Sequence, residues 1–131
     1  MTLHTLFVYG TLRPRCGHPM ATFLAERGAY RGEAKAAGRL FDLGPYPAAT
    51  PSVVPGEWMH GDLYDIDAAT LAALDAYEGD ESPQPSYFGR QIGAVVRADG
   101  ATASAWIYWF HGPLPDAARR IESGDYDKRF A

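Results

Sequence analysis

Short apolar runs and apolar-polar alternation dominate the hydrophobic pattern of this chain. The runs are rich in β-branched and aromatic residues, which favours strands over helices. Asp99-Gly100 separates the last two runs and is a strong hairpin turn signal. We therefore predict extended segments between residues 29 and 43, and strands over residues 5–9, 58–66, 92–96 and 102–110.

Only two segments predict substantial helices. The first is Pro19–Arg27, with proline in its first turn and Gly28 just past its end. The second runs from Ala68 to about Glu78, and it is preceded by a good N-cap residue and followed by a glycine. These flanking residues are Asp67 and Gly79, after which residues 80–86 are predicted to be a loop.

Prolines interrupt the segment from Gly44 to Pro55, which is therefore a shaped loop or an edge strand. After Pro113 we expect one helical turn. Several strands with two helices predict an α+β fold, a small mixed and mostly antiparallel sheet that wraps toward a barrel with two flanking helices. No repeat or linker divides the chain, so residues 1–131 are expected to form one domain.

Composition narrows the possible functions. The chain of 131 residues is 47% hydrophobic, with a net charge of -4 and no run of like charge, so we expect neither nucleic-acid nor membrane binding. A lone cysteine, Cys16, excludes an internal disulfide and fits a reducing compartment. With neither a leader-like start nor an apolar run of about 20 residues, we expect a cytoplasmic protein. We also expect it to be a monomer or a homodimer.

The first strand runs directly into the sequence Tyr9-Gly10-Thr11-Leu12. A rigid strand that ends in a glycine turn with an adjacent hydroxyl can aim backbone N–H groups at an anion. Glycine also lets the backbone adopt unusual angles and approach a ligand closely. An ordinary turn after a buried strand explains the same pattern, and the sequence leaves both interpretations open.

Glu78 occupies an unfavourable place for a charge. On the second helix it falls within about 20° of Leu71, on the apolar face, whereas Asp75 lies at the edge of that face. Burial and the negative end of the helix dipole both disfavour its ionised form, so we expect a raised pKa and a competent general base. Alternatively, the last turn frays and Glu78 meets water, Arg90 or Arg97.

Other chemistries have little support. The four histidines, His4, His18, His60 and His111, show no metal-ligand spacing, and we expect no metal. Neither a serine-nucleophile elbow nor a phosphate-binding glycine motif occurs, and we expect no cofactor. Cys16 in a loop is more often incidental than nucleophilic.

Several motifs, in their order and spacing, resemble the gamma-glutamylcyclotransferase-like proteins, in the small branch that includes gamma-glutamylamine cyclotransferase. The resemblance covers roughly residues 6–110. It is carried by Phe7-Val8-Tyr9-Gly10-Thr11-Leu12-Arg13, the run from Gly38 to Ala48, Gly61-Asp62-Leu63-Tyr64-Asp65-Ile66, Leu74-Asp75-Ala76-Tyr77-Glu78-Gly79 and residues 87–90.

The resemblance implies a small mixed β-barrel and an enzyme that uses no cofactor. It places the catalytic residue on Glu78 and the binding of the substrate's glutamyl head on Tyr9, Gly10, Thr11 and Leu12. We expect Tyr64, Tyr87 and Tyr108 to form walls of the site, and Arg90 to join the binding residues. The loop from Asp80 to Ser86, and the spacing of Tyr87 and Arg90, depart from the family pattern.

The implied reaction is the intramolecular cyclisation of a gamma-glutamyl amine or dipeptide, which releases 5-oxoproline and a free amine. The nucleophile belongs to the substrate, so proximity is already supplied and one glutamate can carry the protons. One alternative is a non-catalytic small-molecule binding module with the same cavity. Another is an enzyme that makes or cleaves a related gamma-glutamylated amine in a biosynthetic pathway.

Overall fold

The computed structural model describes residues 2–14, 16–44, 46–81 and 88–128, and helix α2 without the side chains of its last three residues. Within these ranges the helices are α1 (Pro19–Arg27), α2 (Ala68–Glu81) and a 3-10 turn at Tyr126–Lys128. The strands are β1 (His4–Val8), β2 (Ala29–Ala37), β3 (Arg39–Asp42), β4 (Pro47–Thr50), β5 (Trp58–Ile66), β6 (Phe88–Arg97), β7 (Thr102–Phe110) and β8 (Arg119–Arg120).

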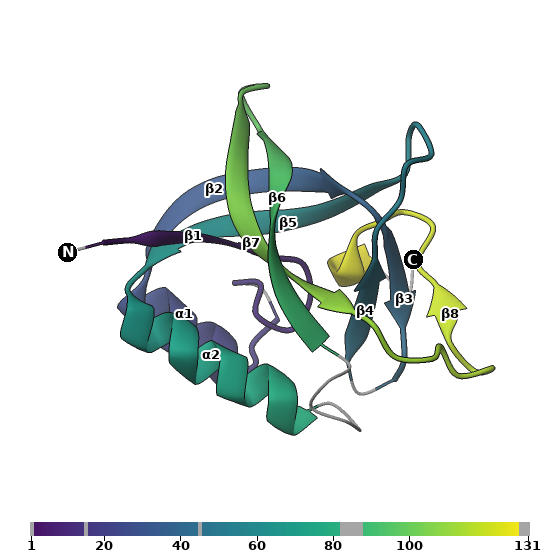
Figure 1. Ribbon diagram of the computed structural model, residues 1–131, viewed down its shortest axis with the longest axis horizontal. Coiled ribbons are helices and arrows are strands. Elements are labelled where there is room, and N and C mark those ends of the chain that lie inside the picture. Colours follow the sequence, from purple (N-terminus) through teal and green to yellow (C-terminus); the bar gives the residue numbers. More distant parts are fainter. Residues whose placement is uncertain (1, 15, 45, 82–87, 129–131) are drawn as a thin grey trace.

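Five strands close into a barrel in the order β1-β5-β2-β6-β7. The closing pair, β1 with β7, is parallel, and the other pairs are antiparallel. Helices α1 and α2 lie side by side along one flank of the barrel, while a small sheet of β4, β3 and β8 lies at its other end (Figure 1). The predicted fold class, a mixed and mostly antiparallel barrel with two flanking helices, is confirmed.

Most predicted elements are present, with several differences. Strand β6 begins at Phe88, four residues before the predicted start at Ile92. Between Pro113 and Gly124, where one helical turn was predicted, the structure has strand β8, and the 3-10 turn comes later, at Tyr126–Lys128. Strand β1 ends at Val8, one residue earlier than predicted, so Tyr9 already belongs to the loop. The proline-rich segment contains β4, which begins at Pro47 and is an edge strand of the small sheet, one of the two predicted alternatives. Helix α2 continues through Gly79 and Asp80 to Glu81, so the predicted end at Gly79 is wrong.

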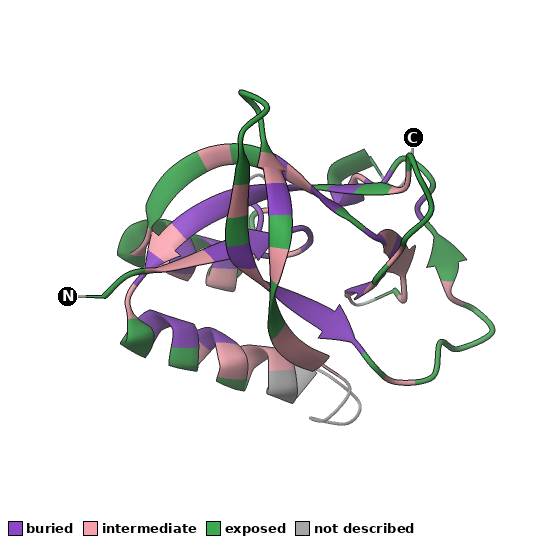
Figure 2. Cartoon of the chain, turned by 45° about the horizontal axis from the view of Figure 1, so that its top comes forward, coloured by how far each residue is buried: buried purple, intermediate pink, exposed green. Residues whose placement is uncertain are grey.

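Two groups of buried side chains fill the molecule. One lies inside the barrel, and the other lies between the barrel and the helices. Strand β7 serves both, because Ile107 and Trp109 belong to the first and Tyr108 to the second, which leaves much of this strand buried (Figure 2). Leu71 and Leu74 belong to the second group and bury one face of α2. Burial of each leucine side chain stabilises the folded state by about 1.5–3 kcal/mol.

The helices that the structure describes are too short or too polar to cross a membrane.

Candidate functional site

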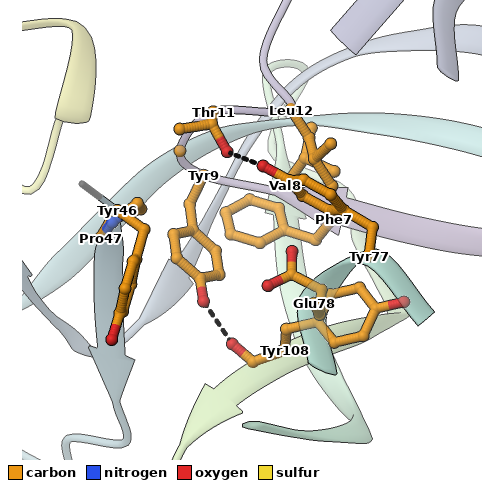
Figure 3. A pocket seen from close by; sticks show the side chains of 11 residues that line it. Phe7, Val8, Tyr9, Thr11, Leu12, Tyr46, Pro47, Tyr77, Glu78 and Tyr108 are labelled. Carbon is orange, nitrogen blue, oxygen red and sulfur yellow. Dashed lines mark hydrogen bonds between the residues drawn. The ribbon is translucent and has the colours of Figure 1, made fainter. Parts of the chain in front are cut away.

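A cavity lies where the loop after β1 meets α2 and β4. The space around it, counted out into open solvent, is about 430 Å³, and the enclosed part is far smaller. The loop itself is tightened by a hydrogen bond of 3.0 Å from the Arg13 amide to the Gly10 carbonyl. The lining residues come from four parts of the chain: Phe7, Val8, Tyr9, Gly10, Thr11, Leu12, Tyr46, Pro47, Tyr77, Glu78 and Tyr108 (Figure 3).

Gly10 is required here for space. A Cβ atom on this residue would lie 2.2 Å from the Cγ atom of Pro47, far inside contact distance. Gly10 is not among the glycines with a positive φ, so its backbone conformation is open to other residues. The structure thus requires glycine here for the close approach of Pro47 and not for an unusual backbone angle, and the close approach of a ligand to Gly10 stays a prediction.

Glu78 comes from the last turn of α2 and is half-buried. Its carboxylate points into the space between Phe7, Tyr9 and Tyr77 (Figure 3). Leu71 and Leu74 dictate this direction, because they bury the face of the helix on which Glu78 also lies. The structure thus brings Glu78 together with Tyr9, Gly10, Thr11 and Leu12, and its role as a proton carrier stays a prediction.

Two tyrosines beside Glu78 are held as neutral phenols. The Tyr9 hydroxyl donates a 2.5 Å hydrogen bond to the backbone carbonyl of Tyr108. Burial, and then the negative charge of Glu78, raise the pKa of Tyr9 well above its ordinary value. Burial, the Asp75 carboxylate and the charge of Glu78 likewise raise the pKa of Tyr108. Neither phenol is therefore a base at neutral pH, which leaves Glu78 as the ionisable group suited to that task.

Asp75 lies one turn before Glu78 and faces different partners. It accepts hydrogen bonds of 2.8 and 2.9 Å from the Arg90 guanidinium and one of 2.7 Å from the Tyr108 hydroxyl. Burial opposes ionisation of Asp75, but the bonds from Arg90 and Tyr108 outweigh it and lower the pKa of Asp75. Arg90 also lies over the Trp106 ring, 4.1 Å from its centre. Arg90 therefore holds Asp75, which in turn binds the lining residue Tyr108, and Arg90 itself does not line the cavity.

The three tyrosines predicted as walls of the site have different outcomes. Tyr64 is buried, packs edge-on against Tyr30 at 5.3 Å and borders a different hollow. Tyr87 lies outside the described residues. Tyr108, predicted as a wall residue, does line the cavity with the loop and Glu78.

Sequence reasoning missed several lining residues, among them Tyr46, Pro47 and Tyr77. Tyr77 precedes Glu78 and lies 3.2 Å, oxygen to oxygen, from the Thr11 hydroxyl. Tyr46 and Pro47 belong to the proline-rich segment, whose position opposite Gly10 depends on the pairing of β4 with β3. Their only sequence signal is that they fall inside one of the motifs that carry the family resemblance.

A second hollow, of about 610 Å³, lies on the other side of the same loop. Here the buried Arg13 guanidinium meets Asp62 at 2.8 Å, Asp125 at 2.7 Å and Asp127 at 3.5 Å. The Tyr30 hydroxyl donates a 2.6 Å hydrogen bond to Asp62. Burial opposes the charge of Arg13, but these carboxylates outweigh it and raise its pKa. We call this group the Arg13 cluster; it joins the loop end to β5 and the C-terminal turn.

Within the described ranges, His, Cys, Asp and Glu side chains do not gather in any group of three that could hold a metal ion. Among the described residues that line the cavity, Glu78 is the only ionisable acid or base with an ordinary pKa near or below neutrality. Chemistry in this cavity would therefore depend on one carboxylate, neutral phenols and backbone groups.

Comparisons with known proteins agree on one family. The sequence profile described as "Gamma-glutamyl cyclotransferase, AIG2-like" matches residues 6–128. The gamma-glutamylcyclotransferase family protein YtfP of Escherichia coli K12 is 34% identical over 122 residues, which cover 92% of this chain and 94% of that protein.

Solved structures show the same fold. YkqA from Bacillus subtilis superposes with a TM-score of 0.73 at 25% identity, over 97% of this chain and 40% of that longer protein. An AIG2-like protein from Mus musculus superposes with a TM-score of 0.70 at 24% identity, over 88% of this chain and 86% of that one.

Proposed function

Because this chain belongs to the gamma-glutamyl cyclotransferase, AIG2-like family and is an enzyme of that type, we propose that it cyclises a gamma-glutamyl amine or dipeptide, releasing 5-oxoproline and a free amine. The observation that carries the proposal is the single cavity in which the loop of residues 9–12 faces Glu78. These two parts are more than sixty residues apart in the sequence and serve complementary tasks in such a reaction.

The reaction needs only proton transfer and positioning. The α-ammonium group of the substrate loses a proton to the Glu78 carboxylate, and the resulting amine attacks the side-chain carbonyl carbon. A five-membered lactam forms as the bond to the leaving nitrogen breaks. Glu78 returns its proton to that nitrogen, then takes the second proton of the α-nitrogen and passes it to the departing amine. The two protons lost by the α-nitrogen equal those gained by the leaving amine, so the reaction consumes no net acid or base.

The loop supplies the positioning. Backbone N–H groups of Gly10, Thr11 and Leu12 would hold the α-carboxylate of the substrate, which keeps the chain in the folded-back shape that cyclisation requires. No lysine or arginine lines the described cavity, so this carboxylate would depend on backbone and hydroxyl donors. The close contact of Gly10 with Pro47 fixes the loop in place.

Replacement of the glutamate tests the proposal. We expect Glu78→Gln to lower the rate of 5-oxoproline release at least about 100-fold, because the amide can neither take nor return a proton. Release is measured by mass spectrometry over a panel of gamma-glutamyl amines and dipeptides. The matched control is Glu26→Gln, since Glu26 is exposed on α1, outside the cavity. Full activity in Glu78→Gln would refute the assignment.

The melting temperature provides a second measurement on the same variant. The carboxylate of Glu78 lies near the negative end of α2, so Glu78→Gln should leave the melting temperature unchanged or raise it. A marked decrease would contradict this expectation. If the wild type is stabilised by 5-oxoproline yet converts no member of the panel, the cavity is a binding site without turnover.

A further inference from the structure

A chain of three side chains leads from helix α1 to the cavity. The His18 Nε2 atom lies 3.3 Å from the Tyr77 hydroxyl oxygen, which lies 3.2 Å from the Thr11 hydroxyl oxygen. The His18 and Tyr77 rings are also in contact, with centroids 5.4 Å apart. Thr11 and Tyr77 line the cavity, whereas His18 does not. His18 therefore reaches the cavity only through these two hydroxyls.

The backbone of α1 fixes the tautomer of His18. His18 is the N-cap of this helix, and its Nδ1 atom accepts a 3.0 Å hydrogen bond from the Met20 amide. An acceptor nitrogen carries no hydrogen, so in the neutral ring the hydrogen must be on Nε2. The Nε2–H group is therefore a donor, and it points at the Tyr77 oxygen.

This donor gives the chain a direction. A hydroxyl that accepts a hydrogen bond becomes a stronger donor, so the Tyr77 hydrogen is favoured toward the Thr11 oxygen. Thr11 then accepts from Tyr77 and keeps its own hydrogen for a different partner. Within the cavity such a hydrogen is suited to an anionic oxygen of a bound ligand.

We propose that His18 is a positioning residue that acts through Tyr77 to orient the Thr11 hydroxyl as a donor to the substrate carboxylate. This inference rests on the proposed function, since it assumes that the carboxylate binds at the loop of residues 9–12. It adds a residue from outside the cavity, and it explains why an unusual N-cap residue, histidine, begins α1. The contact to the carboxylate exists before and during cyclisation, so it affects substrate binding more than the chemical step.

His18→Asn separates the two roles of the histidine. Asparagine is a good N-cap and can accept from the Met20 amide, but it is too short to reach Tyr77. We expect KM to rise about 3- to 10-fold, the factor of one ordinary hydrogen bond, with kcat within about twofold of wild type. His60→Asn is the matched control, because His60 is exposed on β5 and does not line the cavity. It should leave both constants unchanged.

Two further variants test the order of the chain. Tyr77→Phe removes the central hydroxyl and should raise KM at least as much, while the double variant with His18→Asn should show no further increase. Thr11→Ser keeps the hydroxyl and should retain the wild-type KM, whereas Thr11→Val should lose the response to His18→Asn. If His18→Asn fails to fold, Tyr77→Phe and Thr11→Val decide by the same KM criterion.

The outcomes distinguish this inference from the proposed function. A wild-type KM in His18→Asn, in an enzyme that releases 5-oxoproline, would overturn only the role of His18. Additive effects in the double variant would also overturn it. If the wild type neither releases nor binds 5-oxoproline, as measured by calorimetry, the proposed function fails and the inference fails with it. If the wild type binds without turnover, the dissociation constant of 5-oxoproline replaces KM as the criterion.

Discussion

The loop after β1 borders two hollows that differ in both size and chemistry. The larger one, of about 610 Å³, contains the Arg13 cluster, in which the cation is surrounded by three carboxylates. The smaller one, of about 430 Å³, contains phenols, backbone groups and Glu78. Charges that neutralise one another within a few ångströms hold a structure together. A carboxylate among neutral phenols in a cavity is better suited to proton transfer, so volume alone would identify the wrong hollow.

Removal of the cation should have the largest effect on stability. We expect Arg13→Met to lower the free energy of unfolding by about 3–5 kcal/mol, because Asp62 would stay buried without its cation. The control is Arg31→Met, whose ion pair with Asp65 has a half-exposed arginine, and it should cost about 0–1 kcal/mol. Denaturant unfolding measures both. Equal losses would mean that the Arg13 cluster is no more structural than a surface pair.

A change of shape without a change of charge tests the cavity side. We expect Gly10→Ala to destabilise the protein by about 1–3 kcal/mol and to impair turnover, because its Cβ would overlap Pro47 and displace the loop. Gly93→Ala is the control, since the added Cβ would meet only the flexible end of Ile107, at 3.1 Å. It should change stability by less than about 1 kcal/mol. A neutral Gly10→Ala would show that the loop tolerates displacement from Pro47.

The smallest expected effect is on the stability of the protein in acid. Hydrogen bonds from Arg90 and Tyr108 lower the pKa of Asp75 despite its burial. Its contribution to stability is therefore complete above the ordinary pKa of about 3.9 and is lost as the pH falls through the lowered value. Asp75→Asn should make the melting temperature fall less steeply with decreasing pH below about 4. An unchanged slope would show that this ion pair does not contribute.

Local patterns predicted much of the architecture. Strand β5 and helix α1 have the predicted bounds, because alternation and capping depend on neighbouring residues. Asp67 caps α2 with a 2.8 Å bond to the Thr70 amide, as its position predicts. The predicted end of α2 at Gly79 was wrong because a single glycine in a helix costs only about 1 kcal/mol relative to alanine, which is too little to end the helix.

The direction of Glu78 also followed from local pattern, since Leu71 and Leu74 define the buried face of α2 through helical periodicity. The surroundings of Arg90 could not be predicted in this way. Its partner, Asp75, is fifteen residues away on another element, and their contact exists only because β6 packs beside α2.

By itself the sequence determined which segments are strands or helices, which face of α2 is buried, and which family the motifs resemble, because these properties depend on spacing along the chain. Only the tertiary structure decided what each side chain meets. It placed Pro47 against Gly10, gave Asp75 its arginine and set Tyr77 between His18 and Thr11. Such contacts depend on barrel closure and on strand register, which join residues that no local period relates.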